Sequence, residues 1–237
     1  MGRADDIFWA EFLGVTPEEW DTPGLSLRKH AGLTYRGLWS FRRKGRTVVS
    51  APAGWVTALS TLVSQLNEPF LDENEWRAIL GDDFELAIGP AYQGCLDPTH
   101  FRKAHDGDTR FVDQIDPAIA EFRSECSEDD WHLDKVEGPI AACFVGSKIV
   151  AGAGYRSWSE TAGDPCVTTH HDHRGRGFGS AVVSAVVERA LGEGKTLLYQ
   201  TLEANLGAVG VARKVGYEQY ATHLAVRLKR DAKEVEP

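Results

Sequence analysis

The sequence lacks the features that would place this protein in a membrane or direct it out of the cell. Its first residues, Met1-Gly-Arg-Ala-Asp-Asp, include two acids where a secretory signal requires an apolar run. Asp6 stands where N-myristoylation requires serine or threonine. No stretch approaches the roughly 18 consecutive apolar residues of a transmembrane helix. These absences predict a soluble, cytoplasmic protein without a membrane partner.

Cysteine is scarce as well. The 237 residues include four cysteines, which are widely spaced and form no CxxC pair: Cys95, Cys126, Cys143 and Cys166. A disulfide framework is unusual in a chain of this size, so reduced thiols are expected.

Basic residues are outnumbered by acidic ones. The chain has 26 lysines and arginines against 35 aspartates and glutamates, a formal net charge of −9. This charge repels phosphate backbones at long range, which argues against a nucleic-acid partner. It leaves a small anionic ligand open, because local N–H groups and one or two arginines can override the global field. Hydrophobic residues make up 42% of the chain, as in ordinary globular proteins.

The first hundred residues predict mixed α/β structure without recognisable chemistry. Apolar residues recur at helical spacing after Ala51-Pro52, and short β-branched runs flank a basic turn. The predicted elements are strands over residues 38–41, 47–50 and 84–88 and helices over 53–66 and 73–80, the second helix ending at Gly81 in a left-handed conformation. Residues 1–105 are therefore assigned to an accessory α/β region of unknown role.

A polar, turn-rich segment over residues 97–108 predicts a domain boundary. Beyond it, residues 109–237 are expected to form a second domain of regular α/β structure. Its predicted strands cover residues 110–115, 140–145, 149–156, 166–169, 197–202 and 223–228, and its predicted helices cover 117–126, 128–133, 178–191 and 206–215. Since both halves are α/β, a diverged duplication is an open alternative.

The most informative segment covers residues 167–180. A predicted strand leads into a loop, a helix starts at once, and glycine occupies alternate positions: Gly175, Gly177 and Gly179. Without Cβ atoms the backbone N–H groups can converge on a ligand, and the helix start adds unpaired N–H groups and partial positive charge. With Arg174 and Arg176, the loop is predicted to bind a phosphate or pyrophosphate.

Other phosphate-binding loops fit this segment poorly. The dinucleotide motif G-x-G-x-x-G fails because Ser180 stands three residues after Gly177. A Walker loop needs a G-K-S/T ending, and the segment has no lysine. A glycine-rich turn that binds nothing is the remaining alternative, and spacing alone leaves it open.

The loop sequence Arg174-Gly-Arg-Gly-Phe-Gly resembles the Q/R-x-x-G-x-G/A motif of the GNAT N-acyltransferases. The surrounding order also resembles this family, with a strand, the loop, a helix, a second strand, Asn205 and then the Gly216-Tyr217 pair. The resemblance covers roughly residues 110–228. It implies the GNAT fold, a mixed and mostly antiparallel splayed sheet flanked by helices, here preceded by a second α/β region.

The resemblance also implies how acetyl-CoA would bind as co-substrate. Main-chain groups of Val167, Thr168 and Thr169 would pair with the pantetheine amides, and one of their N–H groups would stabilise the thioester oxyanion. Asn205 would bind near the sulfur. The pyrophosphate would be held by the loop and helix start, that is by Arg174, Gly175, Arg176, Gly177, Phe178, Gly179 and Ser180.

Catalysis requires groups that take a proton from the amine and give one to the departing thiolate. The family often places a tyrosine seven residues after the asparagine, but this position is Ala212. Tyr217 is the predicted substitute, with Tyr199 and Tyr220 as alternatives, and departure of the thiolate with help from the main chain alone is left open. The predicted bases are His170 and Glu203, because each ends a strand near the predicted site. For both His170 and Glu203 the alternative stays open that the side chain has no catalytic role and is simply a solvated residue at a strand end.

Two further features favour ordinary roles. His170, His171, Asp172 and His173 are consecutive, so their side chains are expected not to converge on a metal, and no metal is predicted. Cys166 has no evident activating partner and is interpreted as a small buried residue rather than an acyl-enzyme nucleophile.

The expected acceptor is a small cationic molecule or a peptide amine. Acidic residues crowd the first two helices of this half and would attract a cation, although a solvated acidic face is equally compatible: Glu121, Glu125, Glu128, Asp129, Asp130 and Asp134. The predicted function is transfer of an acetyl group from acetyl-CoA to a primary amine by direct attack. The alternative is a non-catalytic acyl-CoA-binding module. A homodimer is left open.

Overall fold

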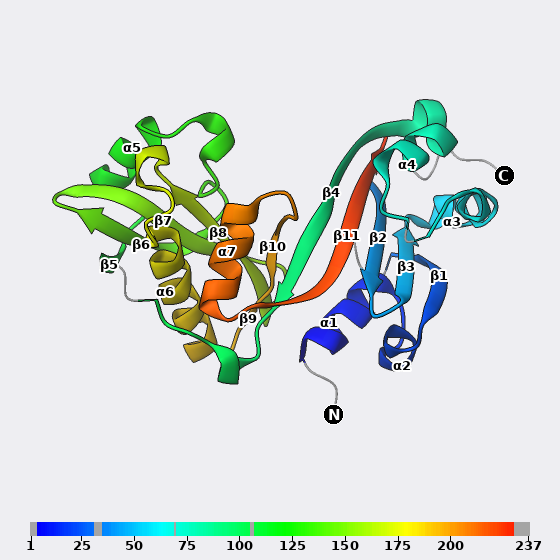
Figure 1. Ribbon diagram of the computed structural model, residues 1–237, viewed down its shortest axis with the longest axis horizontal. Helices are drawn as coiled ribbons and strands as arrows, with labels where there is room; N and C mark the ends of the chain where they lie inside the picture. The colour runs from blue at the N-terminus through cyan, green and yellow to red at the C-terminus, as the bar shows by residue number, and fades with distance from the viewer. Residues whose placement is uncertain (1–3, 31–34, 69, 105–106, 230–237) are drawn as a thin grey trace. The chain divides into compact units, whose positions relative to one another are not determined.

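The computed structural model describes residues 4–30, 35–68, 70–104 and 107–229. The chain divides into two compact units (Figure 1), and neither unit is continuous in sequence. Unit 1 contains Met1–Gln93, Thr201–Ala204 and Gln219–Pro237, and unit 2 contains Gly94–Gln200 and Asn205–Glu218. In the described part of the chain, every helix is too short or too polar to cross a lipid bilayer.

A six-stranded sheet of order β1-β3-β2-β11-β4-β10 forms the centre of unit 1. Its strands are β1 (Gly24–Lys29), β2 (Gly37–Arg43), β3 (Arg46–Ala51), β4 (Phe84–Cys95), β10 (Tyr199–Leu202) and β11 (Glu218–Leu228). The predicted hairpin of β2 and β3 is confirmed, with Arg43 opposite Arg46 across the turn. β4 extends well beyond the predicted residues 84–88. β11 pairs antiparallel with β2, so the end of the chain joins the sheet built by its beginning.

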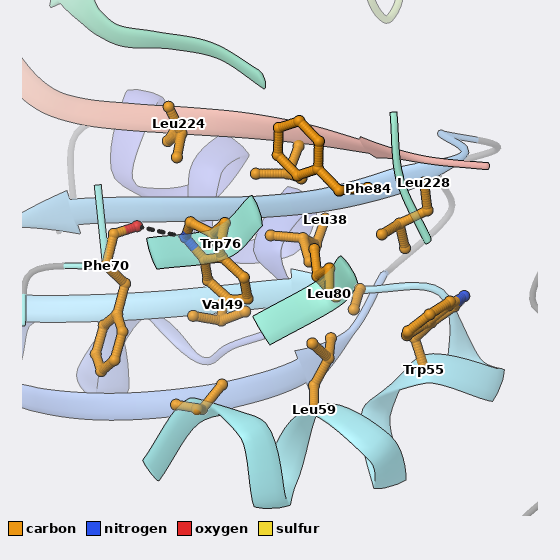
Figure 2. Close-up of a cluster of buried hydrophobic side chains, with 13 residues drawn as sticks. Leu38, Val49, Trp55, Leu59, Phe70, Trp76, Leu80, Phe84, Leu224 and Leu228 are labelled. Carbon is orange, nitrogen blue, oxygen red and sulfur yellow. Dashed lines mark hydrogen bonds between the residues drawn. The ribbon is translucent and has the colours of Figure 1, made fainter. Parts of the chain in front are cut away.

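The core of unit 1 lies on one face of this sheet, under α3 (Ala53–Leu62) and α4 (Glu73–Leu80). Trp76 and Leu59 are fully buried there against Leu38 and Val49 of the strands (Figure 2). The Trp76 indole donates to Phe70 O over 3.0 Å, which satisfies its only polar atom. Both helices were predicted. Gly81 ends α4 with φ 52° and ψ −122°, a glycine conformation outside the predicted left-handed helical region.

The opposite face of the sheet is covered by two helices that the sequence pattern does not predict, α1 (Ala4–Leu13) and α2 (Pro17–Asp21). Trp9 and Trp20 of these helices pack on Phe41, with ring centroids 4.6 and 5.6 Å away. α1 is apolar around most of its circumference, so it carries little helical periodicity. A Thr16–Glu19 capping box starts α2 and is its local signature.

Unit 2 contains a five-stranded sheet of order β5-β6-β7-β8-β9. The strands are β5 (Asp108–Val112), β6 (Glu137–Val145), β7 (Lys148–Ser157), β8 (Ala162–Thr169) and β9 (Thr196–Leu197). Neighbouring strands from β5 to β8 are antiparallel, and β9 pairs with β8 in parallel. The single strand predicted over residues 197–202 is wrong: the chain breaks at Leu198 into β9 and β10, which belong to different sheets.

Three helices accompany this sheet: α5 (Pro117–Ser124), α6 (Phe178–Gly192) and α7 (Leu206–Val215). α6 packs against β6, β7 and β8 (Figure 1), and its four valines are buried. Asp116 caps α5 with a proline directly after it, and α7 ends at the left-handed Gly216. The helix predicted over residues 128–133 is a single 3₁₀ turn, η4 (Glu128–Asp130), because Trp131 is already extended.

The polar segment predicted as a boundary belongs to unit 2 and lies on its helices. Arg102 N–H donates to Val215 O over 2.8 Å, and Ala104 N–H donates to Ser184 Oγ over 3.1 Å. Lys103 pairs with Glu188 at 2.6 Å. Ser184 and Glu188 lie one turn apart on α6, so this segment covers one side of that helix and is part of the packing of unit 2.

Candidate acyl-CoA site

The candidate site begins at the exposed edge of β8. This strand pairs with β7 along residues 163–169, whereas its pairing with β9 is confined to Ala162 and Gly163. Among the residues that the structure describes, no strand pairs with the other edge of β8 from Asp164 to Thr169. The sheet therefore opens beside the strand that was predicted to hold the pantetheine.

The register shows which main-chain groups face this open edge. His170 N–H donates to Val150 O over 3.0 Å, and in an antiparallel pair hydrogen-bonded positions alternate. Thr168 therefore directs its main-chain groups toward Gly152 of β7, while Val167 and Thr169 direct theirs outward. Pro165, which has no N–H, also occupies an outward position, as expected for a strand edge.

This register corrects one predicted contact. The main chain of Thr168 is turned toward β7 and its side chain is buried: Oγ1 accepts from His132 N–H at 3.0 Å and donates to Asp130 O at 3.1 Å. Thr168 joins the η4 turn to β8. The outward N–H groups of Val167 and Thr169 remain the predicted partners of a bound ligand.

The loop after β8 leads to the start of α6 through two glycines with positive φ. Gly175 has φ 74°, and a Cβ there would meet nothing within 4 Å. Gly177 is the N-cap of α6 with φ 90°, a left-handed conformation unfavourable for other residues. The helix ladder starts with Ala181 N–H on Gly177 O, so the preceding N–H groups lie before its first bond. A helix start of this kind can bind an anion, and binding of a phosphate here stays a prediction.

The third glycine has a different role. A Cβ on Gly179 would lie 3.1 Å from Thr169 Oγ1 and 3.5 Å from Val211 Cγ2. Gly179 and Ser180 are buried within the first turn of α6. Gly179 is therefore explained by close packing of α6 against β8 and α7, whereas Gly175 and Gly177 form the exposed turn.

The two loop arginines are already engaged within unit 2. Arg174 Nη2 lies 2.5 Å from Asp130 Oδ1, and its Nε donates to Thr169 O over 3.2 Å. Arg176 Nη1 lies 3.2 Å from His173 Nδ1, and its guanidinium stacks over Phe178. Both arginines are exposed. They precede the helix start directly in sequence, and each guanidinium has a contact within unit 2.

Comparison with known proteins identifies the family to which this region is similar. Residues 102–217 match the sequence profile of the acetyltransferase (GNAT) family. This part of the chain belongs to the GNAT family. The predicted family resemblance and the predicted fold class are thereby confirmed. No protein of curated function matches the sequence.

Solved GNAT structures share this fold. A GNAT acetyltransferase from Colwellia psychrerythraea is 14% identical, with a TM-score of 0.50 over 77% of this chain and 76% of that one. A GNAT protein from Novosphingobium aromaticivorans is 15% identical, with a TM-score of 0.49 over 60% of this chain and 65% of that one. An acetyltransferase from Salmonella typhimurium, described with its cofactor acetyl-CoA, is 14% identical with a TM-score of 0.39, over 55% of this chain and 96% of that one.

Asn205 and Ala212, the positions that the GNAT resemblance marks on α7, both have structural roles here. Asn205 is the N-cap of α7, and its Oδ1 accepts from Ala208 N–H at 3.1 Å. Ala212 is fully buried on the inner face of α7. A tyrosine at position 212 would have to displace packed neighbours.

The histidine cluster overturns one step of the sequence argument. His170, His171 and Asp172 bring one potential ligand atom each to within 4.8 Å of one another, so the expectation that consecutive side chains cannot converge is wrong. The rings of His170 and His171 stack at 4.3 Å and 29°. The nitrogen lone pairs of two stacked imidazoles lie in nearly parallel planes. They therefore do not point toward one common position, as the ligands of a shared ion would. The absence of a metal stays a prediction.

His170 and Glu203, the predicted bases, are placed in different units. His170 is half-buried after β8, and its Nδ1 accepts a long contact, 3.3 Å, from Asp172 N–H. Glu203 belongs to unit 1, where its Oε1 accepts from Gln219 at 2.9 Å and from Thr222 at 2.6 Å. The structure holds each side chain in a defined position, and their catalytic roles stay predictions.

Tyr217, the predicted acid, is 2% exposed and packs its ring on Tyr199 at 5.3 Å. Its hydroxyl therefore lies in the interior of unit 2, so reaching a bound thiolate would require movement of the residues that cover it. Tyr220, an alternative, donates to Asp6 in unit 1, and burial raises the pKa of its phenol. Neither ring is solvent-exposed in the way a surface proton donor would be.

Cys166 lies on β8, and burial, followed by the nearby Asp164 carboxylate, raises the pKa of its thiol to about 11. A thiol with such a pKa is almost entirely protonated at neutral pH. This agrees with the structural interpretation of Cys166 and disfavours an acyl-enzyme.

The acidic residues of α5 and η4 are largely paired. Glu121 and Glu125 both contact Lys148, and Glu128 contacts Arg123. Asp130 contacts Arg174, and Asp134 accepts from the Trp131 indole at 2.6 Å. Three cations thus offset part of the charge of the six acids, so this surface attracts a cationic acceptor less than the sequence suggests. Composition could not reveal this, because Lys148 and Arg174 come from other elements.

Proposed function

We propose that this protein is an N-acetyltransferase that transfers the acetyl group of acetyl-CoA to a primary amine. The observation that supports it is the continuity of three features in unit 2: the open edge of β8, the turn at Gly175 and Gly177, and the start of α6. An extended pantetheine pairs with the outward main-chain groups of Val167 and Thr169. The attached pyrophosphate binds the N–H groups of the turn, together with Arg174 and Arg176.

In this proposal the acceptor amine attacks the thioester carbon directly. An N–C bond forms, the C–S bond breaks, and the ammonium proton passes to a base. The outward N–H of Val167 polarises the carbonyl. The departing thiolate takes a proton from Tyr217 or from solvent, because Ala212 offers none.

The two candidate bases can be distinguished by their chemistry. His170 accepts a proton at Nδ1 by releasing Asp172 N–H, whereas Glu203 is a carboxylate with Oε1 held by two donors. Replacing the true base by His170→Asn or Glu203→Gln should lower kcat roughly 100-fold and flatten the acid limb of the pH–rate profile. The variant of the other residue should keep the wild-type profile.

The acceptor is a small cationic molecule or a peptide amine in this proposal, and the protein acts in the cytoplasm. The test is release of free thiol from acetyl-CoA with a panel of amines and peptides. Release with one acceptor, together with a mass gain of one acetyl group on it, supports the transferase.

A second candidate function is a non-catalytic acyl-CoA-binding module, favoured by the buried Ala212 and the buried Tyr217. It shares the cofactor site, so turnover separates the two functions. Tight CoA binding in calorimetry, with no thiol release above hydrolysis for any acceptor, would favour this second function.

A further inference from the structure

The Arg174 guanidinium has a partner that competes with phosphate. Its Nη2 is 2.5 Å from Asp130 Oδ1 while its Nε donates to Thr169 O over 3.2 Å. A guanidinium paired with a carboxylate is largely neutralised. Its full charge becomes available to a phosphate when that pair separates.

Asp130 is the fixed member of this pair. Ser127 Oγ donates to its Oδ2 over 2.7 Å, Asp130 N–H donates back to Ser127 Oγ over 3.3 Å, and Asp130 O accepts from buried Thr168 Oγ1. These three bonds hold the carboxylate beside β8. Arg174 carries a long side chain that is 51% exposed, so it is the member that can change rotamer.

The same guanidinium also closes one end of the open edge. Thr169 O faces outward from β8, and Arg174 Nε occupies it. A pantetheine N–H that pairs with Thr169 O must displace this contact. One arginine movement therefore frees both the charge for the pyrophosphate and the carbonyl for the pantetheine.

We propose that Asp130 is a positioning residue that holds Arg174 away from the phosphate site in the free protein, and that cofactor binding exchanges the Asp130–Arg174 pair for an Arg174–pyrophosphate contact. This inference rests on the proposed cofactor site. The exchange is feasible because an exposed ion pair contributes little, and because Asp130 keeps its Ser127 bond and partial hydration after Arg174 leaves.

The test is calorimetric titration of the full-length protein with CoA. Asp130→Asn keeps the side-chain shape and removes the charge, so CoA should bind roughly two- to ten-fold more tightly. Asp129→Asn is the matched control, since it removes a neighbouring charge from the same turn. It should change the affinity less than two-fold. In an Arg174→Gln background, Asp130→Asn should give no tightening.

Unchanged or weaker CoA binding by Asp130→Asn would overturn the inference, as would equal tightening by Asp129→Asn or tightening that persists without Arg174. If the wild-type protein bound no CoA at millimolar concentration, the proposed function would fail together with the inference. If it bound CoA and the Asp130 variant behaved like wild type, the inference alone would fail.

A measurement on the wild-type protein covers the case in which the variant does not fold. The Nε–H resonance of Arg174, assigned in a ¹⁵N-labelled sample, should shift on addition of CoA or inorganic pyrophosphate as the Asp130 and Thr169 contacts are lost. A resonance that stays unchanged at saturating CoA contradicts the exchange.

Discussion

Arg43 of unit 1 and Arg174 of unit 2 both pair with aspartate, but their side chains are 5% and 51% exposed. Arg43 contacts Asp6 at 3.1 Å and Asp21 at 2.8 Å, and lies over the Tyr220 ring at 4.4 Å. Arg174 contacts one carboxylate, that of Asp130, and one main-chain carbonyl, that of Thr169 at the end of β8. A buried charge depends on its partners, whereas an exposed one can exchange them.

The same contrast holds for the other polar groups of the two units. In unit 1, His30 bonds to Ser50 and to Gly37 O, both at 2.8 Å, in the interior. In unit 2, the outward main-chain groups of Val167 and Thr169 lie on the edge of β8 that no described strand covers, and the loop before α6 follows directly. The first arrangement serves the fold, and the second is suited to a ligand.

The largest effect is expected when the buried charge of unit 1 is removed. Arg43→Met should lower the free energy of unfolding by about 3–5 kcal/mol, because Asp6 is left without its counter-charge. Urea denaturation measures this. Arg28→Met is the control in the same unit, because the Arg28–Glu19 pair is over a third exposed, and it should cost about 1 kcal/mol or less. Equal costs would remove the contrast between buried and exposed arginines.

His223 should make the stability of unit 1 depend on pH. It is 4% exposed between Trp39 and Phe41, and burial lowers its pKa to about 4. The unfolded chain binds the proton near pH 6.5 and the folded protein only near pH 4, so stability falls as pH drops between these values. The loss should reach about 3 kcal/mol.

The difference between wild type and His223→Phe isolates this contribution from that of the carboxylates. The urea midpoint of wild type minus that of His223→Phe should fall steadily as the pH is lowered from 7 to 4. A His223→Phe profile parallel to that of wild type would contradict the buried neutral histidine.

Gly177→Val tests the ligand-binding side of the contrast. Valine is strained at φ 90° and its side chain enters the loop, so CoA affinity should fall at least about ten-fold, with a cost near 1–3 kcal/mol in the turn itself. Calorimetry with CoA measures the affinity and circular dichroism checks the fold. Unchanged affinity would place the cofactor elsewhere.

The smallest effect is expected for Gly192→Ala at the other end of the same helix. Here φ is not positive and a Cβ meets nothing within 4 Å, so alanine should stabilise the protein by about 0.4–1 kcal/mol. CoA affinity should be unchanged. A loss of affinity here would mean that the Gly177 effect reflects α6 as a whole and not the turn at its start.

Local signals predicted most of unit 2. Asp116 with the following proline, the apolar residues of α6 and the left-handed Gly216 each act over a few neighbours, so the pattern was sufficient. A helix was predicted over residues 128–133, but only the η4 turn forms. The main chain after this turn bonds to Thr168 of β8, because Thr168 Oγ1 accepts from His132 N–H. α1 was missed because its apolar residues surround the helix without a helical period.

The sequence by itself determined the glycine turn, the charges beside it and the helix that follows, because these depend on backbone sterics and on adjacent residues. Only the tertiary structure decided that Thr168 faces inward while Val167 and Thr169 face outward, since this follows from the register with β7. It also decided that Asp130 meets Arg174 and that β11 completes the sheet of unit 1. These contacts join residues far apart in the chain, and their free energy comes from burial and pairing that no local pattern encodes.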